Sequence, residues 1–183
     1  MKYLLRKYPQ FAACGLNCGL CPRYYTKGSS RCPGCSGEGF NETHCSCSII
    51  ACCQRKEIEY CYMCEEYPCS KYEKTWVDSF ISCVNIFHDA EKAKQIGLET
   101  YINELNTKMD ILKILLENYD DGRRKSFYCL AVNLLDLQDV KSVIDKIGDK
   151  VAPQDTLKEK AKIVVGLFQA TAMERGIELK LRK

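Results

Sequence analysis

Cysteine is concentrated in one part of this chain of 183 residues. Twelve of the fourteen cysteines lie between Cys14 and Cys69, and only Cys83 and Cys129 follow them. Thiols crowded in this way are either cross-linked as disulfides, as in small secreted domains, or bound to metal ions, as in intracellular proteins. The cysteines therefore leave two kinds of fold for this segment, and the compartment decides between them.

The amino-terminal residues carry no signal-peptide pattern. They offer only Leu4 and Leu5 as an apolar pair, followed directly by Arg6 and Lys7, whereas a signal peptide needs roughly 7–15 apolar residues in its central part. The chain also lacks the run of roughly 20 apolar residues that crosses a bilayer. We therefore predict a cytoplasmic protein without a membrane partner, whose clustered thiols stay reduced and bind metal.

Two Cys-x-x-Cys units give this prediction a local geometry. They are Cys32-Pro33-Gly34-Cys35 and Cys61-Tyr62-Met63-Cys64. Two intervening residues let the chain turn so that both sulfurs face one ion, at about 2.3 Å for zinc, and Pro-Gly suits such a turn. Further thiols surround both units, which favours a structural metal site over an isolated redox pair. The predicted metal ligands are Cys14, Cys18, Cys21, Cys32, Cys35, Cys45, Cys47, Cys52, Cys61, Cys64 and Cys69.

The number of clustered thiols suits two or three tetrathiolate sites, although spacing alone does not say which cysteines share an ion. Both zinc and iron–sulfur clusters accept such ligands, and we predict structural zinc. The alternative is an iron–sulfur enzyme or electron carrier that uses Cys14, Cys18 and Cys21, because their spacing is that of radical S-adenosylmethionine enzymes. Leu20 stands where that motif usually has an aromatic residue, and no barrel-forming pattern follows. These two departures favour zinc.

Residues 1–69 and residues 70–183 differ in composition. The first segment holds four of the five prolines and six of the eleven glycines, and its apolar residues follow neither a helical nor a strand period. Such a segment has few means to build an apolar core, so bound ions would hold it together. We predict an α-rich protein, with a small irregular zinc-knuckle-like metal-binding module in residues 1–69 and a helical bundle in residues 70–183.

Apolar periodicity predicts the helices of the second segment. A first stripe, from residue 70 onward, comprises Tyr72, Trp76, Phe80, Val84 and Phe87. A second, over residues 90–118 with a break near Gly97, comprises Ile102, Leu105, Met109, Leu112, Leu116 and Tyr119. After a turn at residues 120–122, a third helix from Ser126 carries Phe127, Leu130, Ala131, Leu134 and Leu135.

Capping residues place the last two helices. Asp136 is expected to cap a helix that ends just before Gly148, and a final helix is expected over residues 156–175 with Gly176 as its terminator. The core-facing residues of this final helix are Leu157, Ala161, Val164, Phe168 and Ala172. A short strand is expected over residues 177–182, where apolar and charged residues alternate.

Some residues near the thiols have two interpretations. His44 precedes Cys45 and is either a solvated side chain or a further metal ligand. Cys53 is either a ligand or a spare thiol. Cys83 and Cys129 lie in apolar stretches and are interpreted as small buried hydrophobes. His88 is interpreted as a structural or exposed residue.

Evidence for a partner or a reaction is sparse in this sequence. Arg123-Arg124-Lys125 is the densest basic patch and could hold a phosphate or RNA at the start of a helix. The net charge of +3 would become about −3 if twelve thiolates held three divalent ions, which argues against general nucleic-acid binding. Tyr60, Tyr62 and Tyr67 are interpreted as shielding sulfurs. Phosphate-loop, dinucleotide, nucleophile-elbow and zinc-protease motifs are absent, so no catalytic residue is assigned, and the partner is left as protein or RNA.

The ordered cysteines are similar to a known pattern. The matching pieces are Cys14-Gly15-Leu16 with Cys18, Cys21 and Pro22, then Cys32-Pro33-Gly34-Cys35, then Cys47 and Cys52, then Cys61 and Cys64 with Pro68-Cys69. In this order they resemble the cysteine-rich family called domain of unknown function 3795, over roughly the first 70 residues. The resemblance implies metal binding and no reaction. Cys45 and Cys53 are additional to the family's pattern.

Overall fold

The computed structural model describes residues 5–44, 46–72 and 77–182. Regular structure within these ranges is helical, and no strand occurs in them. The α-rich class predicted from the sequence is therefore confirmed. None of the described helices is both long and apolar enough to cross a membrane. The five longer helices are α3 (Ile86–Ile96), α4 (Leu98–Asn118), α5 (Lys125–Leu134), α6 (Leu137–Lys150) and α7 (Leu157–Glu174).

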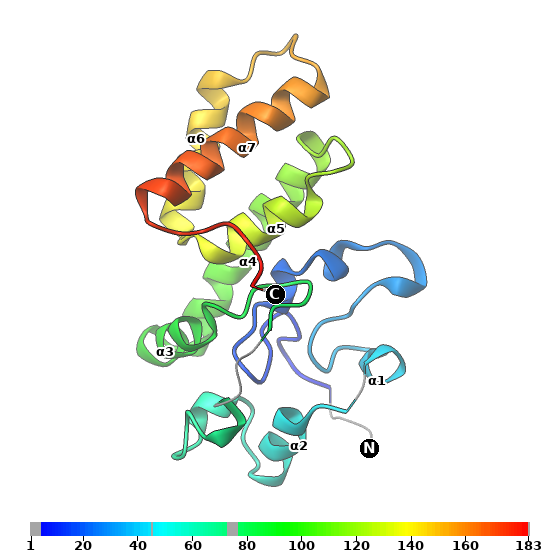
Figure 1. Cartoon of the computed structure of the whole chain (residues 1–183). Coiled ribbons are helices and arrows are strands. Elements are labelled where there is room, and N and C mark those ends of the chain that lie inside the picture. Colours follow the sequence, from blue (N-terminus) through cyan, green and yellow to red (C-terminus); the bar gives the residue numbers. More distant parts are fainter. Residues whose placement is uncertain (1–4, 45, 73–76, 183) are drawn as a thin grey trace.

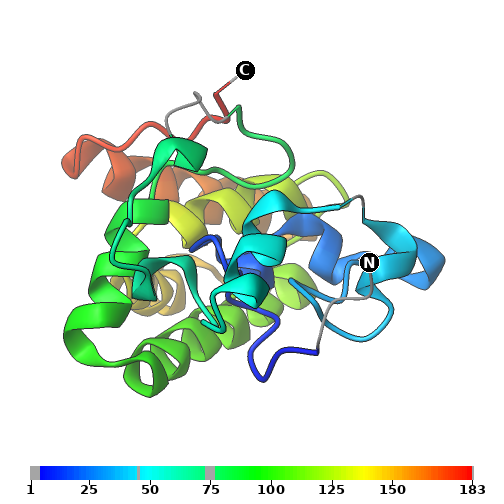
Figure 2. The ribbon, with the colours of Figure 1, turned by 90° about the horizontal axis from the view of Figure 1, so that it is seen from below.

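Residues 5–72 are built from short turns and two short helices. The helices are α1 (Phe40–Thr43) and α2 (Ser48–Arg55), and 3₁₀ turns lie at Cys18–Leu20, Pro22–Tyr25, Gly28–Ser30, Cys61–Met63 and Ser70–Tyr72. Figure 1 and Figure 2 show these loops gathered on one side of the longer helices. The irregular backbone predicted for this region is confirmed, while a zinc knuckle within it stays a prediction.

Helix α4 is the central element. It contacts α3, α5 and α6, and also the 3₁₀ turn at Cys18–Leu20. Its buried stripe recurs every three or four residues and comprises Ile102, Leu105, Met109, Leu112 and Leu115. The first four were predicted, whereas the predicted Leu116 and Tyr119 are only partly buried. A Cβ atom on Gly19 would lie 2.8 Å from the Cβ atom of Gln10 and closer still to the sulfur of Met109. A larger residue at this contact between the cysteine-rich region and the helices would force these side chains to shift.

Helices α6 and α7 form an extensively contacting pair above α4 and α5. Helix α7 starts with a capping box, in which the Glu159 N–H donates to the Thr156 hydroxyl (3.3 Å) and the Thr156 N–H donates to the Glu159 carboxylate (2.8 Å). Phe168 is fully buried in its apolar face, where burial of a side chain of this size contributes about 2 kcal/mol. Gly176 ends the helix with a φ of 65°, as predicted.

One apolar core joins the two regions. Phe11, Leu20 and Tyr60 of the cysteine-rich region are fully buried in the same cluster as the inner faces of the helices. Phe11 packs between the rings of Tyr60 (5.2 Å between centroids) and Tyr101 (4.8 Å). A smaller cluster, centred on Phe40, Ile49 and Ile50, lies entirely within the cysteine-rich region. The proposed division of the chain at Cys69 stays a prediction.

The helix predicted from residue 70 through Phe87 is wrong over the described residues. Residues 77–85 form bends and turns, and α3 begins only at Ile86. Trp76, part of the same prediction, lies outside the described residues. The carboxylate of Asp78 accepts hydrogen bonds from the Cys83 N–H (2.8 Å) and the Ser82 hydroxyl (3.1 Å). Such side-chain bonds to a nearby backbone compete with helix formation.

Three smaller predictions also fail. Gly148 lies inside α6, which continues to Lys150. Leu157 is 47% exposed because it sits in the first turn of α7, away from the core. Residues 177–182 form no strand. The described hydrogen bonds of their backbone are within the segment, to the end of α7 and to Asp78, so they pair with no neighbouring strand. A single strand without a pairing neighbour is not stable.

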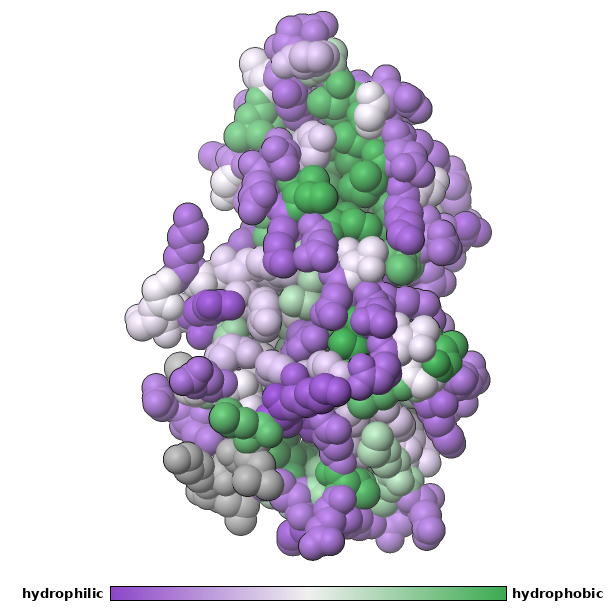
Figure 3. All heavy atoms as spheres, turned by 180° about the vertical axis from the view of Figure 1, so that it is seen from behind, coloured by the Kyte–Doolittle hydropathy of each residue, from purple (hydrophilic) through white to green (hydrophobic). Residues whose placement is uncertain are grey.

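The surface differs between the halves of the molecule. On the face opposite to that of Figure 1, a strip of apolar side chains runs through the upper half, where α4 to α7 lie, between hydrophilic borders (Figure 3). The lower half of this face is more mixed. Ile114 on α4 is 48% exposed and Met173 on α7 is 83% exposed.

Candidate metal centre

The structure describes thirteen of the fourteen cysteines, and none of these thirteen forms a disulfide bond. Cys45, a predicted ligand, lies outside the described residues. The remaining clustered thiols fall into two sets. The first thiol group comprises Cys14, Cys18, Cys21, Cys32, Cys35 and Cys47, and the second thiol group comprises Cys52, Cys53, Cys61, Cys64 and Cys69.

A close packing of loops assembles the first thiol group. Cys18 starts the 3₁₀ turn that packs on α4, and Cys21 precedes the next turn. Cys35 follows Gly34, whose φ of 87° confirms the tight turn expected from Pro-Gly. The Cys35 N–H donates to the Pro9 carbonyl (2.7 Å), and a Cβ atom on Gly34 would lie 2.3 Å from the same oxygen. Glycine is thus required at this position in the Cys-x-x-Cys unit.

The second thiol group surrounds a cavity of about 270 Å³. All five of its cysteines line this space, together with Lys56, Glu66 and Tyr67. A 3₁₀ turn brings Cys61 and Cys64 together, since the Cys64 N–H donates to the Cys61 carbonyl (3.0 Å). Helix α2 supplies Cys52 and Cys53. Residues from three separate segments therefore place their thiols on one cavity.

Burial and mutual repulsion raise the pKa of four thiols in the first thiol group. Burial is the largest cause that raises the pKa of the Cys14 and Cys18 thiols, and the neighbouring charges of Cys35 and other thiols raise it further. Burial also raises the pKa of Cys21 and Cys35. Without a cation these thiols keep their protons, because several buried thiolates side by side repel one another. A bound metal ion would replace those protons.

Two cationic side chains lie beside the thiols. Lys56 donates from Nζ to the Cys64 sulfur (3.2 Å) and to the Glu66 carboxylate (2.9 Å). The charge of Arg6 opposes the burial that raises the pKa of Cys35 and of Cys53, which reaches about 12. Arg6 also stacks over the ring of Tyr60, at 4.3 Å from the centroid. Both cations reduce the cost of negative charge on sulfur.

His44 lies next to the first thiol group. Its Nε2 atom is 3.5 Å from the Cys32 sulfur, and its ring stacks on Phe40 at 4.3 Å between centroids. Burial lowers the pKa of His44, which favours the neutral imidazole that metals bind. The contact with Cys32 supports the interpretation of His44 as a further ligand.

A metal site requires several ligand side chains that converge on one point, which is a stricter condition than lining the same cavity. Within the part of the chain that the structure describes, no three side chains of His, Cys, Asp or Glu converge closely enough to hold a metal ion. The donor chemistry nonetheless fits a thiophilic ion, because free thiols from distant segments line one cavity and no disulfide joins the described cysteines. The division of ligands among ions therefore stays a prediction.

The other residues singled out in the sequence have mixed outcomes. Cys129 is 1% exposed in the helical core, as predicted for a small hydrophobe, whereas Cys83 is only half-buried in the loop before α3. Tyr60 is fully buried and Tyr67 lines the cavity of the second thiol group, which agrees with a shielding role.

The basic patch is partly engaged inside the protein. Arg124 pairs with Asp121 (3.5 Å), and Lys125 donates to the Thr26 hydroxyl (3.2 Å). Arg123 is the exposed member of the three. Binding of RNA or of a protein partner by these residues stays a prediction.

Sequence reasoning missed a buried polar cluster between the two regions. Asn17, between Cys14 and Cys18 in sequence, donates to the Asp89 carboxylate (2.8 Å) and accepts from the Tyr101 hydroxyl (2.9 Å). Asn17 and Asp89 are 2% and 7% exposed. The only trace of this cluster in the sequence is a polar residue on the inner face of α3, which a single sequence does not distinguish from an exposed one.

Together these features define a helix-rich protein with an irregular, cysteine-rich amino-terminal region. Residues 10–74 match the model of a family described as "Protein of unknown function (DUF3795)". The match spans all twelve clustered cysteines and confirms the resemblance found in the sequence. No curated protein and no solved structure matches the chain.

Proposed function

We propose that the cysteine-rich region is a structural metal-binding module that holds two or three zinc ions through thiolates. The observation that most supports this proposal is the cavity of the second thiol group, lined by five cysteines from three segments of the chain. Zinc would supply tetrahedral cross-links there, with no redox chemistry of its own. The proposed location is the reducing cytoplasm, where such thiols stay available to metal.

The proposed ligands follow the two thiol groups. Cys52, Cys61, Cys64 and Cys69 would hold one ion, with Cys53 left in the small apolar core beside them. In the first group, the proposed set is Cys14, Cys18, Cys35 and Cys47, because Cys35 acts on both Cys14 and Cys18, and Cys47 acts on both Cys14 and Cys35. Cys21 and Cys32 would form the start of a third set, which His44 or Cys45 would help to complete.

A structural role is favoured because the region has little else to stabilise it. Its own apolar cluster is small and includes the side chains of Cys35, Cys53 and Cys61. Each closed zinc site adds several kcal/mol to folding, up to roughly 10 kcal/mol for a tight site. Bound metal would therefore provide the cross-links that longer helices and a larger core provide elsewhere in the chain.

Metal analysis of the full chain, purified without air and without added metal, tests the proposal. The expected result is two or three zinc ions per chain and no visible absorbance. Brown protein with iron and sulfide would instead establish the iron–sulfur alternative, and metal-free monomeric protein would refute metal binding altogether.

A pair of variants tests the assignment of the second thiol group. The double substitution Cys61→Ser with Cys64→Ser is expected to remove one zinc ion per chain, because it deletes two of four ligands. Cys129→Ala serves as the matched control, since Cys129 is a buried thiol on α5 that does not line the cavity of the second thiol group. Equal metal content in the two proteins would contradict the assignment of the second thiol group.

A further inference from the structure

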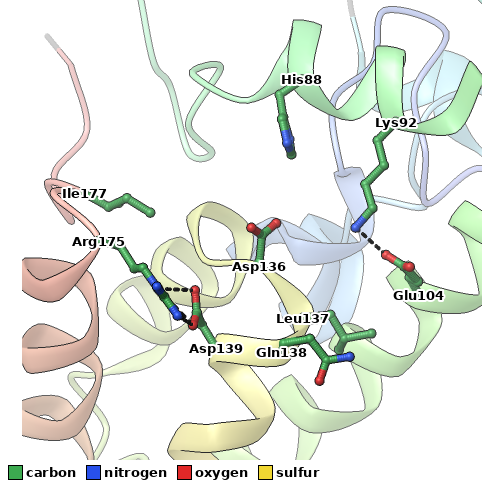
Figure 4. Close-up of a pocket in the computed structure, with 9 residues that line it drawn as sticks. All are labelled: His88, Lys92, Glu104, Asp136, Leu137, Gln138, Asp139, Arg175 and Ile177. Carbon is green, nitrogen blue, oxygen red and sulfur yellow. Dashed lines mark hydrogen bonds and ion pairs between the residues drawn. The ribbon is translucent and has the colours of Figure 1, made fainter. Parts of the chain in front are cut away.

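A second cavity, of about 670 Å³, lies among the helices and outside the cysteine-rich region (Figure 4). Helices α3 and α4 form one wall, the amino-terminal end of α6 forms the floor, and the carboxyl end of α7 closes the other side. Its lining combines charged side chains with the apolar side chains of Leu137 and Ile177. The family match ends before all of these elements.

Both permanent cations of the cavity are already paired with carboxylates. On one wall the Lys92 ammonium lies 2.6 Å from Glu104. On the other, the guanidinium of Arg175 binds Asp139 through two nitrogens, with Nε 3.0 Å from both carboxylate oxygens and Nη2 2.6 Å from one of them. These pairs leave little attraction for an anionic ligand.

Asp136 is different, because it forms no direct ion pair with a described residue, although the charges of Arg175 and Lys108 act on it. It occupies the N-cap position of α6, yet its side chain accepts no hydrogen bond from the first turn. Its carboxylate makes no hydrogen bond or ion pair with any described residue, and Figure 4 shows it directed into the cavity beneath His88. When Asp89 and Lys108, which act on the lining residues, are included, four carboxylates face three permanent cations, and one negative charge remains.

His88 provides a second acceptor opposite Asp136. Its Nδ1 atom lies 3.5 Å from the carboxylate of Asp89, which is buried and held by Asn17. A carboxylate at Nδ1 keeps the proton of the neutral ring on that nitrogen, so Nε2 carries a lone pair. Two acceptors therefore face one cavity, in which the cationic donors Lys92 and Arg175 are already paired with carboxylates.

We propose that this cavity binds a small aliphatic amine in its protonated form, with the ammonium group held between Asp136 and His88. The hydrogens of the ammonium would be donated to the Asp136 carboxylate and to Nε2 of His88. The alkyl chain would lie against Leu137 and Ile177, which are the apolar part of the lining. Charge selects the cation, and the apolar wall selects an alkyl chain over a bare metal ion.

A proton on Nε2 of His88 would compete with the amine, because it would occupy the lone pair that accepts from the ammonium group and would add a positive charge beside it. The groups that act on His88 are Asp89 and Lys92 on its own helix and Asp136 on α6, while Glu104 and Lys108 on α4, Asp139 on α6 and Arg175 on α7 complete the surroundings. The contact with Asp89 is the largest cause that raises the pKa of His88. Since an alkylamine stays protonated up to about pH 10, its binding should strengthen as the pH rises and His88 loses its proton.

The test uses the full ¹⁵N-labelled protein and three probes of equal length, namely butylamine, 1-butanol and butanoate. Butylamine is expected to produce saturable shifts in the amide signals of residues 137–139, while 1-butanol and butanoate produce none. Asp136→Asn keeps the shape and the capping ability of the residue, and it should weaken butylamine binding about tenfold, as loss of a charge-assisted hydrogen bond does. Asp145→Asn, an exposed position on the same helix, is the matched control and should bind as the unmodified protein does.

Other results would overturn the proposal. These are an absence of saturable shifts with butylamine, tighter binding of butanoate, or equal affinities in the two asparagine variants. His88→Gln should bind butylamine with an affinity that no longer depends on pH between about 6 and 8. An unchanged pH dependence in that variant would remove His88 from the site.

Discussion

The two regions of this molecule solve the same stability problem in different ways. Residues 77–182 rely on five helices whose apolar stripes share one core. Residues 5–72 have only short turns, two short helices and a small apolar cluster that includes cysteine side chains. The difference teaches where the two segments offset conformational entropy: the helical segment does so with its shared apolar core, whereas the proposed metal ions would add cross-links to the segment rich in glycine and proline.

The regions are nevertheless not independent. Phe11, Leu20 and Tyr60 extend from the loops into the helical core, and Asn17 bonds with Asp89 and Tyr101 across the boundary. The loops therefore gain part of their stability from the helices. Three experiments test how far this contrast and this connection hold.

Metal removal is expected to give the largest difference in stability between the two regions. A zinc chelator added to the reduced full-length protein is expected to abolish amide-exchange protection in residues 10–72, because each lost site removes several kcal/mol, up to roughly 10 kcal/mol. Amides of α4, α6 and α7 should keep their protection. Hydrogen exchange read by mass spectrometry measures both, and zinc added back should restore the first. Unchanged protection in residues 10–72 would mean that metal does not hold this region.

A core truncation should act on the helices instead. Phe168→Ala, at a fully buried position of α7, is expected to lower the free energy of unfolding by about 4 kcal/mol, through lost burial and a new cavity. Met173→Ala on the same helix is the control, because that side chain is 83% exposed, and it should change stability by less than about 0.5 kcal/mol. Urea unfolding gives both values. Bound metal should be the same in both variants, and a loss of metal in Phe168→Ala alone would break the proposed separation.

The polar connection should have a smaller effect. Asn17→Ala removes the amide that bonds with both Asp89 and the Tyr101 hydroxyl in a buried position, and we expect a loss of about 2 kcal/mol in unfolding free energy. Asn106→Ala is the control, because Asn106 is exposed and its side chain accepts a hydrogen bond from Gln10 at the surface. If both variants unfold at the same urea concentration, the buried cluster does not couple the regions.

Predictions from the sequence succeeded where a local rule acts alone. Gly97 separates α3 from α4 with a φ of 85°, and Thr156 caps α7. They failed where distant contacts compete with local pattern. The aromatic stripe through Phe80 imitates a helix, yet Phe80 lies under Arg23 (5.2 Å), and Tyr72 packs against Tyr67. These rings are spaced by loop packing and not by a helical turn.

The candidate sites also differ in how much of each could be predicted from the sequence. The thiols were evident from the spacing of cysteines, because two residues between ligands suffice to turn a chain around one ion. Their division into two groups was not, since Cys52 and Cys69 meet Cys61 only through the packing of α2 against later loops. The second cavity was invisible, because His88 and Asp136 come from separate helices.

The sequence by itself determined that this protein is helix-rich, that its thiols crowd into the first third, and where several helices begin and end, since propensity, capping and short-range spacing act between near neighbours in the chain. Only the tertiary structure decided which thiols face a common cavity, that Asn17 binds Asp89, and that Asp136 forms no direct ion pair with a described residue. Those outcomes depend on how helices pack against one another and against the loops, and such long-range contacts leave no local pattern in a single sequence.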